Sequence, residues 1–437
     1  MDAIKVGIIG FGTVGAGTYE VLTANEKLIA AKVGAPVRVV KIADLDIETD
    51  RGVTVERSLL TTSASEVIQD PEIDIVVELA GGTGIAVEFI MESMSRGKHV
   101  VTANKALLAT HGRRIYQHAA DSGVGFAFEA SVGGGIPIIG ALRTGLSANR
   151  IETVMGILNG TSNYILTRMS KEGLPYQDVV NEAVRLGFAE DPPDLDVKGI
   201  DTAHKLAIIS SIMLGRTVSL EDIHCEGITA ISPDDIYYAG EFGFCLKLLA
   251  IARVDGERLE ARVHPAMIPK THILANVGDA FNAIYLEGDF VGPNLYYGLG
   301  AGRRPTASAV AADIIDLARR IRAGAAYFIP PLGRLTAPPD PVHVRSIDEH
   351  EGPYYFRFSA LDRPGVLSRL SGILGDNDIS IYSVIQKGRD RNGSVPVVML
   401  THEARERDVR NALRMTAGLD VLTDMPVMIR VEGHGGA

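Results

Sequence analysis

The residues best suited to chemistry lie in one short stretch, LGFAEDPPDLDVKGIDTAHKL, residues 186–206. Asp201 and Lys205 are four positions apart, so in a helix that starts near Gly199 they share one face within pairing distance. The following AIISSIMLG is apolar on nearly every face, which predicts a buried helix. Burying a lysine and several carboxylates is costly unless the charges are paired, bind a metal or take part in chemistry. An acidic surface loop before a helix with an ordinary ion pair would show the same spacing. The other charged residues of the stretch are Glu190, Asp191, Asp194, Asp196 and Lys198.

A glycine-rich turn near the N-terminus predicts a dinucleotide site. The apolar, β-branched run from Ile4 to Ile9 indicates a strand buried on both faces. It leads into G-x-G-x-x-G, whose glycines permit a tight turn, close approach of a pyrophosphate and packing of the next helix on the strand. The helix N-terminus then offers free N–H groups to the diphosphate. The motif consists of Gly10, Phe11, Gly12, Thr13, Val14 and Gly15.

Asp44 is the candidate partner of the adenosine ribose. It follows a second predicted strand, Val37 to Ala43, where an acidic residue typically binds the ribose hydroxyls. It lies 29 positions after Gly15, against a usual spacing of about 20, so a solvated loop carboxylate is the alternative. No arginine directly flanks Asp44, although Arg51 is nearby, and this favours NAD weakly over NADP.

Further parallel strands are predicted at Ile73 to Leu79 and Lys98 to Thr102, with a helix from about Ile85 to Arg96 between them. Thr83 lies in the glycine-rich loop after the first of these strands, where a loop near the cofactor is expected. Lys105 follows the second, at the carboxyl end of a parallel strand, where open α/β sheets bind ligands. A surface lysine would fit this position equally well.

Another strand is predicted at Val124 to Glu129, followed by ASVGGGIP. Three consecutive glycines expose carbonyl groups that could ligate a hard cation beside Glu129. The same run could simply be the hinge that leaves a domain.

The α/β alternation loosens after Pro137. A strand from Ile151 to Leu158 leads into a helix, a second helix is expected from Tyr176 to Leu186, and strand-like runs occupy residues 244–297. This pattern predicts a mixed sheet backed by helices, with a face for self-association. A second glycine-rich loop, residues 298–306, opens a helix from about Thr306 to Ala323 that is expected to pack back on the nucleotide domain.

The last part of the chain has a pattern of its own. Proline-rich segments at 330–331 and 337–341 predict a semi-rigid linker. Beyond them the order βαββαβ marks a ferredoxin-like module of about 80 residues. Its elements are expected at Tyr354 to Ala360, a helix ending near Gly375, Ile379 to Gln386, Ser394 to Thr401, Ala404 to Thr416 and Met425 to Val431.

These patterns predict an α/β protein with a Rossmann dinucleotide-binding domain, an α+β substrate and dimerisation domain, and a C-terminal ferredoxin-like domain. The expected boundaries are 1–136, 137–305, a returning helix at 306–325, a linker at 326–350 and the last domain at 351–437.

Composition excludes several classes of function. The net charge of −11 argues against non-specific nucleic-acid binding. No apolar segment reaches membrane-spanning length, and no signal peptide is expected from MDAIKVGIIG. Two cysteines, Cys225 and Cys245, cannot build a disulfide framework, which suits a reducing compartment. A cytoplasmic protein is therefore expected.

Taken together, the motifs resemble the homoserine dehydrogenase family over nearly the whole chain, and the C-terminal module resembles an ACT domain through DRPGVL, residues 362–367. The matching motifs are GFGTVG at Gly10, ANK ending at Lys105, EASVGGGIP at Glu129, GILNGTSNYIL at Gly156, LGFAE…DVKGIDTAHK ending at Lys205, and GLGAGRRPTASAV at Gly298.

The resemblance implies reversible NAD(P)-dependent interconversion of L-homoserine and L-aspartate 4-semialdehyde, a step towards threonine, isoleucine and methionine. By resemblance Lys205 exchanges the proton at the substrate oxygen, and Lys105 shares its site. The resemblance also implies three further groups: Glu190, Asp201 and Asp196 at the substrate ammonium; Phe11, Thr13, Val14, Lys105, Gly187 and Gly302 at the cofactor; and Glu129 with the carbonyls of Val132, Gly134 and Ile136 at a structural Na⁺ or K⁺.

Regulation by threonine at the ACT domain and a homodimer or homotetramer are expected from the family. The chain departs from it at Asp191-Pro192, where an aspartate is displaced by one position, and at Ala43, where many relatives carry an arginine suited to a 2′-phosphate. Two alternatives stay open: an amino-acid sensor that binds nucleotide without catalysis, and a dehydrogenase of another amino-acid aldehyde.

Overall fold

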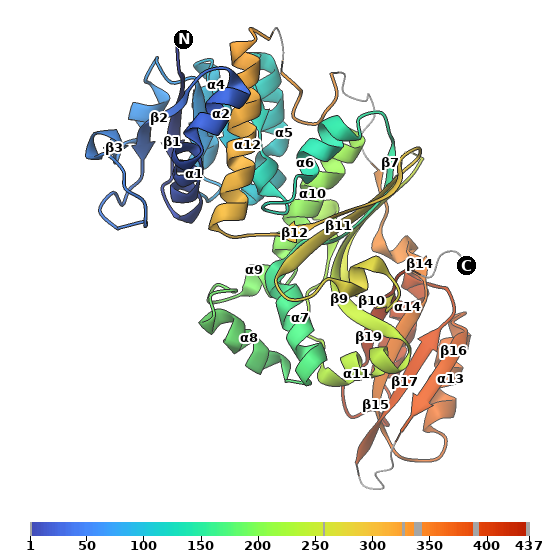
Figure 1. Ribbon diagram of the computed structural model, residues 1–437. Helices are drawn as coiled ribbons and strands as arrows, with labels where there is room; N and C mark the ends of the chain where they lie inside the picture. The colour runs from blue at the N-terminus through green and yellow to red at the C-terminus, as the bar shows by residue number, and fades with distance from the viewer. Residues whose placement is uncertain (1, 257, 326–327, 336–342, 388–392, 434–437) are drawn as a thin grey trace.

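The computed structural model describes residues 2–256, 258–325, 328–335, 343–387 and 393–433 (Figure 1). Parts of the predicted linker and of the C-terminal domain, including residues 337–341, lie outside the described residues. The described chain contains a six-stranded sheet, an eleven-stranded sheet and a small two-stranded one.

The N-terminal half is a parallel sheet with the order β3-β2-β1-β4-β5-β6. Its central strand β1 is buried almost throughout, as expected for a strand covered on both faces by helices. This is the Rossmann-like arrangement that the sequence predicted. The strands are β1 (Ile4–Ile9), β2 (Val37–Ala43), β3 (Leu60–Thr61), β4 (Ile75–Glu78), β5 (His99–Thr102) and β6 (Phe126–Ala127), and the helices are α1 (Thr13–Ala24), α2 (Glu26–Val33), α3 (Ala64–Ile68), α4 (Ile85–Ser95) and α5 (Lys105–Ser122).

The prediction was wrong at both edges of this sheet. It missed β3, a strand of two residues that pairs only with the end of β2. It also made the last strand too long, because a 3₁₀ turn begins at Glu129 and only Phe126 and Ala127 pair with β5. Edge strands need so few residues that their hydrophobic pattern is too short to read from sequence.

Helix α12 (Arg303–Arg322) returns from the second half and packs against α1, as Figure 1 shows. The two helices approach closely at Gly17, where an added Cβ would lie 2.8 Å from Arg303 Cγ and 3.1 Å from Ala307 Cβ. The helix begins three residues before the predicted Thr306.

The second half is built on a mixed sheet whose order is β12-β11-β7-β9-β10-β19-β15-β17-β16. Strands β9 and β10 are the long central pair, joined in antiparallel register from Phe244↔Pro269 to Asp255↔Arg258. Helices α7 and α10 both contact β9. The elements are α6 (Ile138–Gly140), β7 (Ile151–Ile157), α7 (Gly160–Glu172), α8 (Tyr176–Arg185), α9 (Asp194–Val197), α10 (Ile200–Leu214), β8 (His224–Cys225), α11 (Pro233–Glu241), β9 (Phe244–Asp255), β10 (Arg258–Pro269), β11 (Phe281–Gly288) and β12 (Gly292–Leu299).

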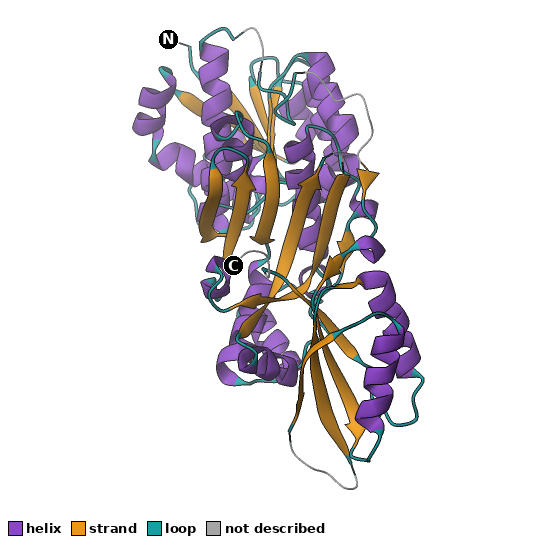
Figure 2. Cartoon of the chain, turned by 90° about the vertical axis from the view of Figure 1, so that its right-hand side faces the viewer, coloured by secondary structure: helices purple, strands orange, loops and turns teal. Residues whose placement is uncertain are grey.

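The C-terminal module has the predicted βαββαβ order, but its sheet is not separate. Its last strand, β19, runs parallel to β10 with Ala266 opposite Arg430 and Met267 opposite Val431, so one sheet continues through both domains (Figure 2). A short strand before the module, β13 (His343–Val344), also pairs with β10. The remaining elements are β14 (Glu351–Gly352), β15 (Tyr354–Leu361), α13 (Val366–Asp376), β16 (Ile381–Gln386), β17 (Ser394–Thr401), β18 (Ala404–Arg405), α14 (Glu406–Ala417) and β19 (Val427–Val431).

Candidate active site

Lys205 lies on α10 with its ammonium group held by two acceptors. Its Nζ donates to Asp201 Oδ2 and to the main-chain oxygen of Leu158, each at 2.6 Å. The helix starts after Gly199, which has a left-handed φ of 81° and turns the chain sharply out of α9. The predicted pair on one face of a buried helix therefore forms, and only 9% of the Lys205 side chain is exposed.

Asp201 joins the two halves of the molecule. Its other carboxylate oxygen, Oδ1, lies 3.1 Å from Nζ of Lys105, the first residue of α5. Lys105 therefore reaches the site from the carboxyl end of strand β5, while Lys205 reaches it from the second domain. The side chain of Lys105 is 43% exposed, so this lysine faces the open side of the site.

Asn159 is a member of this cluster that the sequence did not single out. Its Nδ2 donates to Asp196 Oδ1 at 2.6 Å and to Asp201 Oδ2 at 2.9 Å, and its Oδ1 accepts from the N–H of Ser162 at the start of α7. One amide thus holds two carboxylates side by side. The turn and cap residues NGTSN predicted a helix start, but only the fold could bring Asn159 to residues some forty positions later.

The charges of the cluster shift one another's protonation. Burial alone would raise the pKa of Asp201, but Lys205 and Lys105 hold it well below its usual range. Burial lowers the pKa of Lys205, and neighbouring Lys105 lowers it further while Asp201 opposes. The Asp201 charge raises the pKa of Lys105, with Asp196 and Glu190 adding to the effect. The pKa values of the two lysines therefore shift in opposite directions: Lys205 is favoured as the free base and Lys105 as the cation.

The loop before α9 carries the remaining predicted carboxylates. Asp196 is half-buried, and burial raises its pKa. Glu190 is exposed and lies close enough to Lys105 to influence its charge. Asp191, the displaced aspartate, is exposed, as is Gly187, which has a φ of 75°. The side of the cluster that faces this loop is thus acidic and open to solvent.

The glycine motif forms the turn that a dinucleotide needs. Gly10 has a φ of 96°, and a Cβ there would lie 2.4 Å from the N atom of Ala80. A Cβ on Gly15 would lie 2.1 Å from the oxygen of Gly10, so only glycine lets α1 pack this close to β1. By contrast, nothing lies within 4 Å of a Cβ on Gly12, the N-cap of α1. This opening is where the motif is expected to receive a pyrophosphate.

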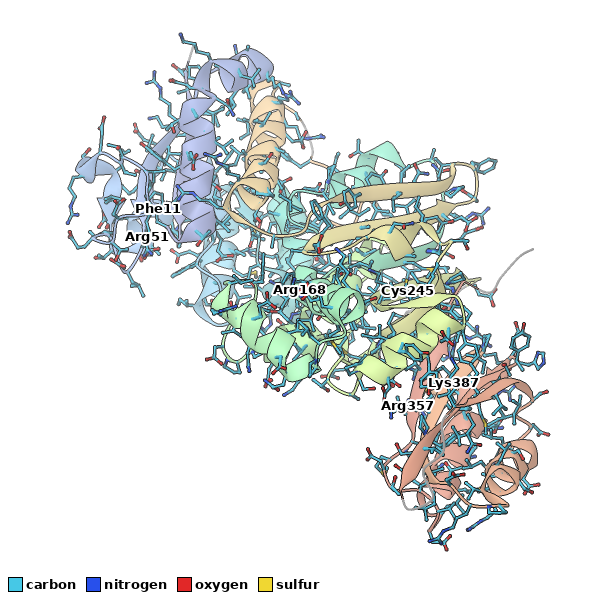
Figure 3. The ribbon with its side chains drawn as sticks, turned by 60° about the horizontal axis from the view of Figure 1, so that its bottom comes forward. Phe11, Arg51, Arg168, Cys245, Arg357 and Lys387 are labelled. Atoms are coloured by element: carbon cyan, nitrogen blue, oxygen red, sulfur yellow. The ribbon has the colours of Figure 1, made fainter. Side chains whose placement is uncertain are left out.

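Asp44 lies beside the same turn. Its carboxylate accepts the N–H of Phe11 and, through Oδ1, the N–H of Asp46. Arg51, which Figure 3 labels together with Phe11 on the nucleotide-binding half, is paired with Asp46 at 3.1 Å. The other predicted cofactor residues lie on exposed or turn positions: Thr13 at the first turn of α1, Thr83 in the loop after β4, and Gly302 with a φ of 117° at the N-cap of α12.

Comparison with known proteins gives the family of this chain. Residues 10–129 match the family model described as homoserine dehydrogenase, NAD binding domain, residues 137–315 match homoserine dehydrogenase, and residues 354–414 match the ACT domain. The homoserine dehydrogenase of Pseudomonas aeruginosa is 42% identical to this chain, and that of Neisseria gonorrhoeae is 41% identical. Each match covers 99% of this chain and 99% of the relative. The chain belongs to the homoserine dehydrogenase family.

Solved structures of the homoserine dehydrogenase family share this fold. A homoserine dehydrogenase from Thiobacillus denitrificans is 43% identical with a TM-score of 0.91, and 99% of each chain is covered. A hyperthermophilic archaeal homoserine dehydrogenase in complex with NADPH is 26% identical with a TM-score of 0.62, covering 72% of this chain and 97% of the archaeal one. The chain is therefore an NAD(P)-dependent oxidoreductase of this family, as the sequence predicted, with a Rossmann-like domain, a catalytic domain and an ACT domain. No helix among the described residues is long and apolar enough to span a membrane.

At the expected cation site, the Glu129 side chain is held by main-chain N–H groups and lies next to a second carboxylate. Glu129 Oε1 and Oε2 accept the N–H groups of Ile139 and Gly140 at 2.8 and 2.6 Å. The N–H of Glu129 donates to Asp313 Oδ2 on α12 at 2.7 Å. Burial raises the pKa of both carboxyl groups, to about 8 for Asp313. The charge of the buried Arg143 opposes this rise in pKa at both carboxyl groups, although no ion pair within 4 Å joins Arg143 to either carboxylate.

Proposed function

We propose that this enzyme interconverts L-homoserine and L-aspartate 4-semialdehyde, with Lys205 exchanging the proton of the substrate hydroxyl. The observation that carries this assignment is the Asp201 carboxylate set between Lys205 and Lys105, at the carboxyl end of β5 where parallel sheets bind ligands. Bound NAD(P) supplies the redox chemistry by accepting hydride from the alcohol carbon.

Lys205 is the better base of the two lysines. Because burial and Lys105 lower its pKa, a larger fraction of Lys205 is the free amine at neutral pH than for a solvated lysine. That amine accepts the hydroxyl proton during oxidation and returns it during reduction. Lys105, whose pKa is raised, stays cationic and stabilises the partial negative charge on the same oxygen.

The acidic side of the cluster suits the ammonium group of an amino-acid substrate. We assign this role to Glu190, Asp196 and Asp201, all of which raise the pKa of Lys105 through their charge. Asn159 keeps Asp196 and Asp201 together, since its amide donates to both and offsets their repulsion.

For the cofactor we propose a preference for NAD. A carboxylate at Asp44 suits the ribose hydroxyls of NAD and repels the 2′-phosphate of NADP. Arg51, seven positions after Asp44, is already paired with Asp46, which weakens its attraction for a second anion. The residues proposed to hold the dinucleotide are Gly10, Phe11, Gly12, Thr13, Val14, Gly15, Asp44, Thr83, Lys105, Gly187 and Gly302.

A structural monovalent cation fits beside Glu129. Glu129 lies next to a second buried carboxylate, Asp313, and a Na⁺ or K⁺ would offset negative charge there in addition to Arg143. We propose that Glu129 and the carbonyls of Val132, Gly134 and Ile136 hold it.

We further propose a cytoplasmic homodimer or homotetramer that is regulated by threonine at the ACT domain. Strand β12 is the edge of the large sheet and exposes Leu295, Tyr297 and Leu299, a pattern suited to a second copy of the substrate domain. The proposed domain boundaries are those expected from the sequence: 1–136, 137–305, 306–325, 326–350 and 351–437.

The test is the growth of reduced-nicotinamide absorbance when the purified protein meets L-homoserine with NAD and then with NADP. We expect a signal with both cofactors and a faster rate with NAD. Other amino-acid alcohols in place of L-homoserine should be oxidised more slowly. Silence with L-homoserine, from protein shown to bind nucleotide, would overturn the proposed substrate.

A further inference from the structure

A buried arginine of the ACT domain is tied to the catalytic domain. Arg430 on β19 donates from Nη1 and Nη2 to both carboxylate oxygens of Glu226, at 2.8 and 2.9 Å. Its Nε donates to Glu406 at the start of α14 at 2.9 Å, and Tyr354 donates its hydroxyl to the same carboxylate. The Arg430 side chain is 1% exposed, so its position is fixed by these two carboxylates.

Glu226 belongs to a segment, residues 225–228, that contacts the end of α9 and the residues just after it. The N–H of Ile228 donates to the oxygen of Val197 at 2.8 Å, and the Cys225 thiol contacts the oxygen of Lys198 at 3.4 Å. A Cβ on Gly227 would lie 2.1 Å from the Val197 oxygen, so the two segments are in main-chain contact. The N–H of Glu226 itself donates to Val263 on β10.

The contacted residues 197–199 lie between two of the proposed substrate carboxylates. Asp196 immediately precedes them, and Asp201 follows in the first turn of α10. A Cβ added at Gly199 would lie 3.2 Å from the main-chain oxygen of Glu226 and 3.2 Å from Cys225 Sγ. A shift of residues 225–228 would therefore move the backbone that carries Asp196 and Asp201.

We propose that Arg430 and Glu226 are positioning residues for the substrate carboxylates, so that the ACT domain sets the geometry of the amino-acid site through this ion pair. The inference rests on the proposed function, since it assumes that Asp196 and Asp201 bind the substrate ammonium. It requires no movement of the nucleotide domain, because none of these contacts involves the glycine turn.

A second ion pair across the same boundary supplies a control. Arg357 on β15 donates to Asp235 on α11, with Nε 2.6 Å from Oδ1 and Nη2 3.1 Å from Oδ2. Figure 3 labels Arg357 and Lys387 where the C-terminal module meets the rest of the chain. Asp235 is also fully buried, but its helix α11 contacts α7 and β9. Loss of Arg357 would weaken the boundary without touching residues 197–199.

The experiment compares steady-state kinetics of full-length R430M, E226Q and R357M. We expect R430M and E226Q to raise KM for L-homoserine roughly 2- to 30-fold, the range found for residues that couple sites, with KM for the nicotinamide cofactor unchanged. R357M should lose thermal stability but keep KM for L-homoserine. The double variant E226Q/R430M should be no worse than R430M, since R430M already removes the pair with Glu226 together with the contact to Glu406.

Three results distinguish the possible failures. Equal KM values for L-homoserine in R430M, R357M and the parent enzyme would overturn the positioning role. If R430M does not fold, E226Q decides, because the Glu226 side chain is 36% exposed and the substitution is isosteric. D196N tests the proposed substrate assignment separately. An unchanged KM for L-homoserine in D196N would overturn that assignment, independently of the result for R430M.

Discussion

Lys205 donates its ammonium proton to Asp201 over 2.6 Å, from one turn further along the same buried helix. The pair combines two opposing effects, since burial drives Lys205 towards the free base while Asp201 favours the cation. The proposed proton exchange by this lysine therefore depends on neighbours that shift its pKa, and these neighbours can be changed one at a time.

Replacing Lys205 by methionine should remove the proton acceptor while keeping the shape of the site. Proton transfer by a positioned side chain contributes about 10²- to 10⁴-fold, so we expect kcat for homoserine oxidation to fall by that factor. Nucleotide binding, measured by fluorescence of the reduced cofactor, should stay within about twofold. Full turnover in K205M would contradict the assigned role.

The pH dependence of oxidation should shift in opposite directions in two variants. The parent rate should rise with pH and level off where Lys205 has lost its proton, below the 10.5 of an ordinary lysine. D201N removes the charge that raises the pKa of Lys205, so its rising limb should move to lower pH. K105M removes the charge that lowers this pKa, so its limb should move to higher pH. Residual kcat measured against pH tests both, and shifts of the same sign would contradict the arrangement.

Asn159 should be needed for substrate binding, and Asn163 provides a matched control on the same helix. N159A removes the amide that donates to Asp196 and Asp201, leaving two carboxylates to repel each other; we expect a loss of about 1–3 kcal/mol in stability and a higher KM for L-homoserine. Asn163 is equally buried, but its amide donates to the main-chain oxygens of Val277, Asp279 and Phe281. N163A should therefore lose stability without the change in KM. A normal KM in N159A would show that the amide is only structural.

The sequence predicted the structure correctly where one local pattern determines it. The apolar run and glycine turn at residues 4–15 predicted β1 to the residue, and the four-residue spacing predicted the pair of Asp201 and Lys205. Asn159 could not be assigned, because its partners depend on how α7 packs against α9 and α10. The contact of Arg430 with Glu226 could not be predicted either. It depends on the parallel pairing of β19 with β10, two strands far apart in the sequence.

The continuous sheet changes how ACT regulation should be tested. Deleting residues 351–437 would remove β19, and Arg262 of β10, which is 1% exposed, would lose Glu432 and keep only Glu260 as an ion-pair partner among the described residues. The truncated protein would also expose the part of β10 that pairs with β19, so it should unfold earlier and lose activity for that reason alone. Titration of L-threonine into the full-length enzyme is the better measurement. We expect inhibition together with a rise in Tm, and the absence of both would contradict threonine as the effector.

The Asp313 carboxylate accepts the Glu129 N–H, and burial raises the pKa of Asp313 from 3.8 to about 8. Between these two pH values the folded protein holds a proton that the unfolded chain has released, so stability must fall as pH rises from about 4 to about 8. D313N keeps the acceptor and removes the titration, so it should be more stable than the parent at pH 8, by on the order of a few kcal/mol, and this advantage should shrink steadily towards pH 4. D316N is the control, because Asp316 lies on the same helix but is 54% exposed and paired with Arg320. If D313N and D316N have the same Tm profile against pH, the raised pKa is wrong; if Na⁺ or K⁺ stabilises the parent at pH 8 and not at pH 5, the cation proposed beside Glu129 is supported.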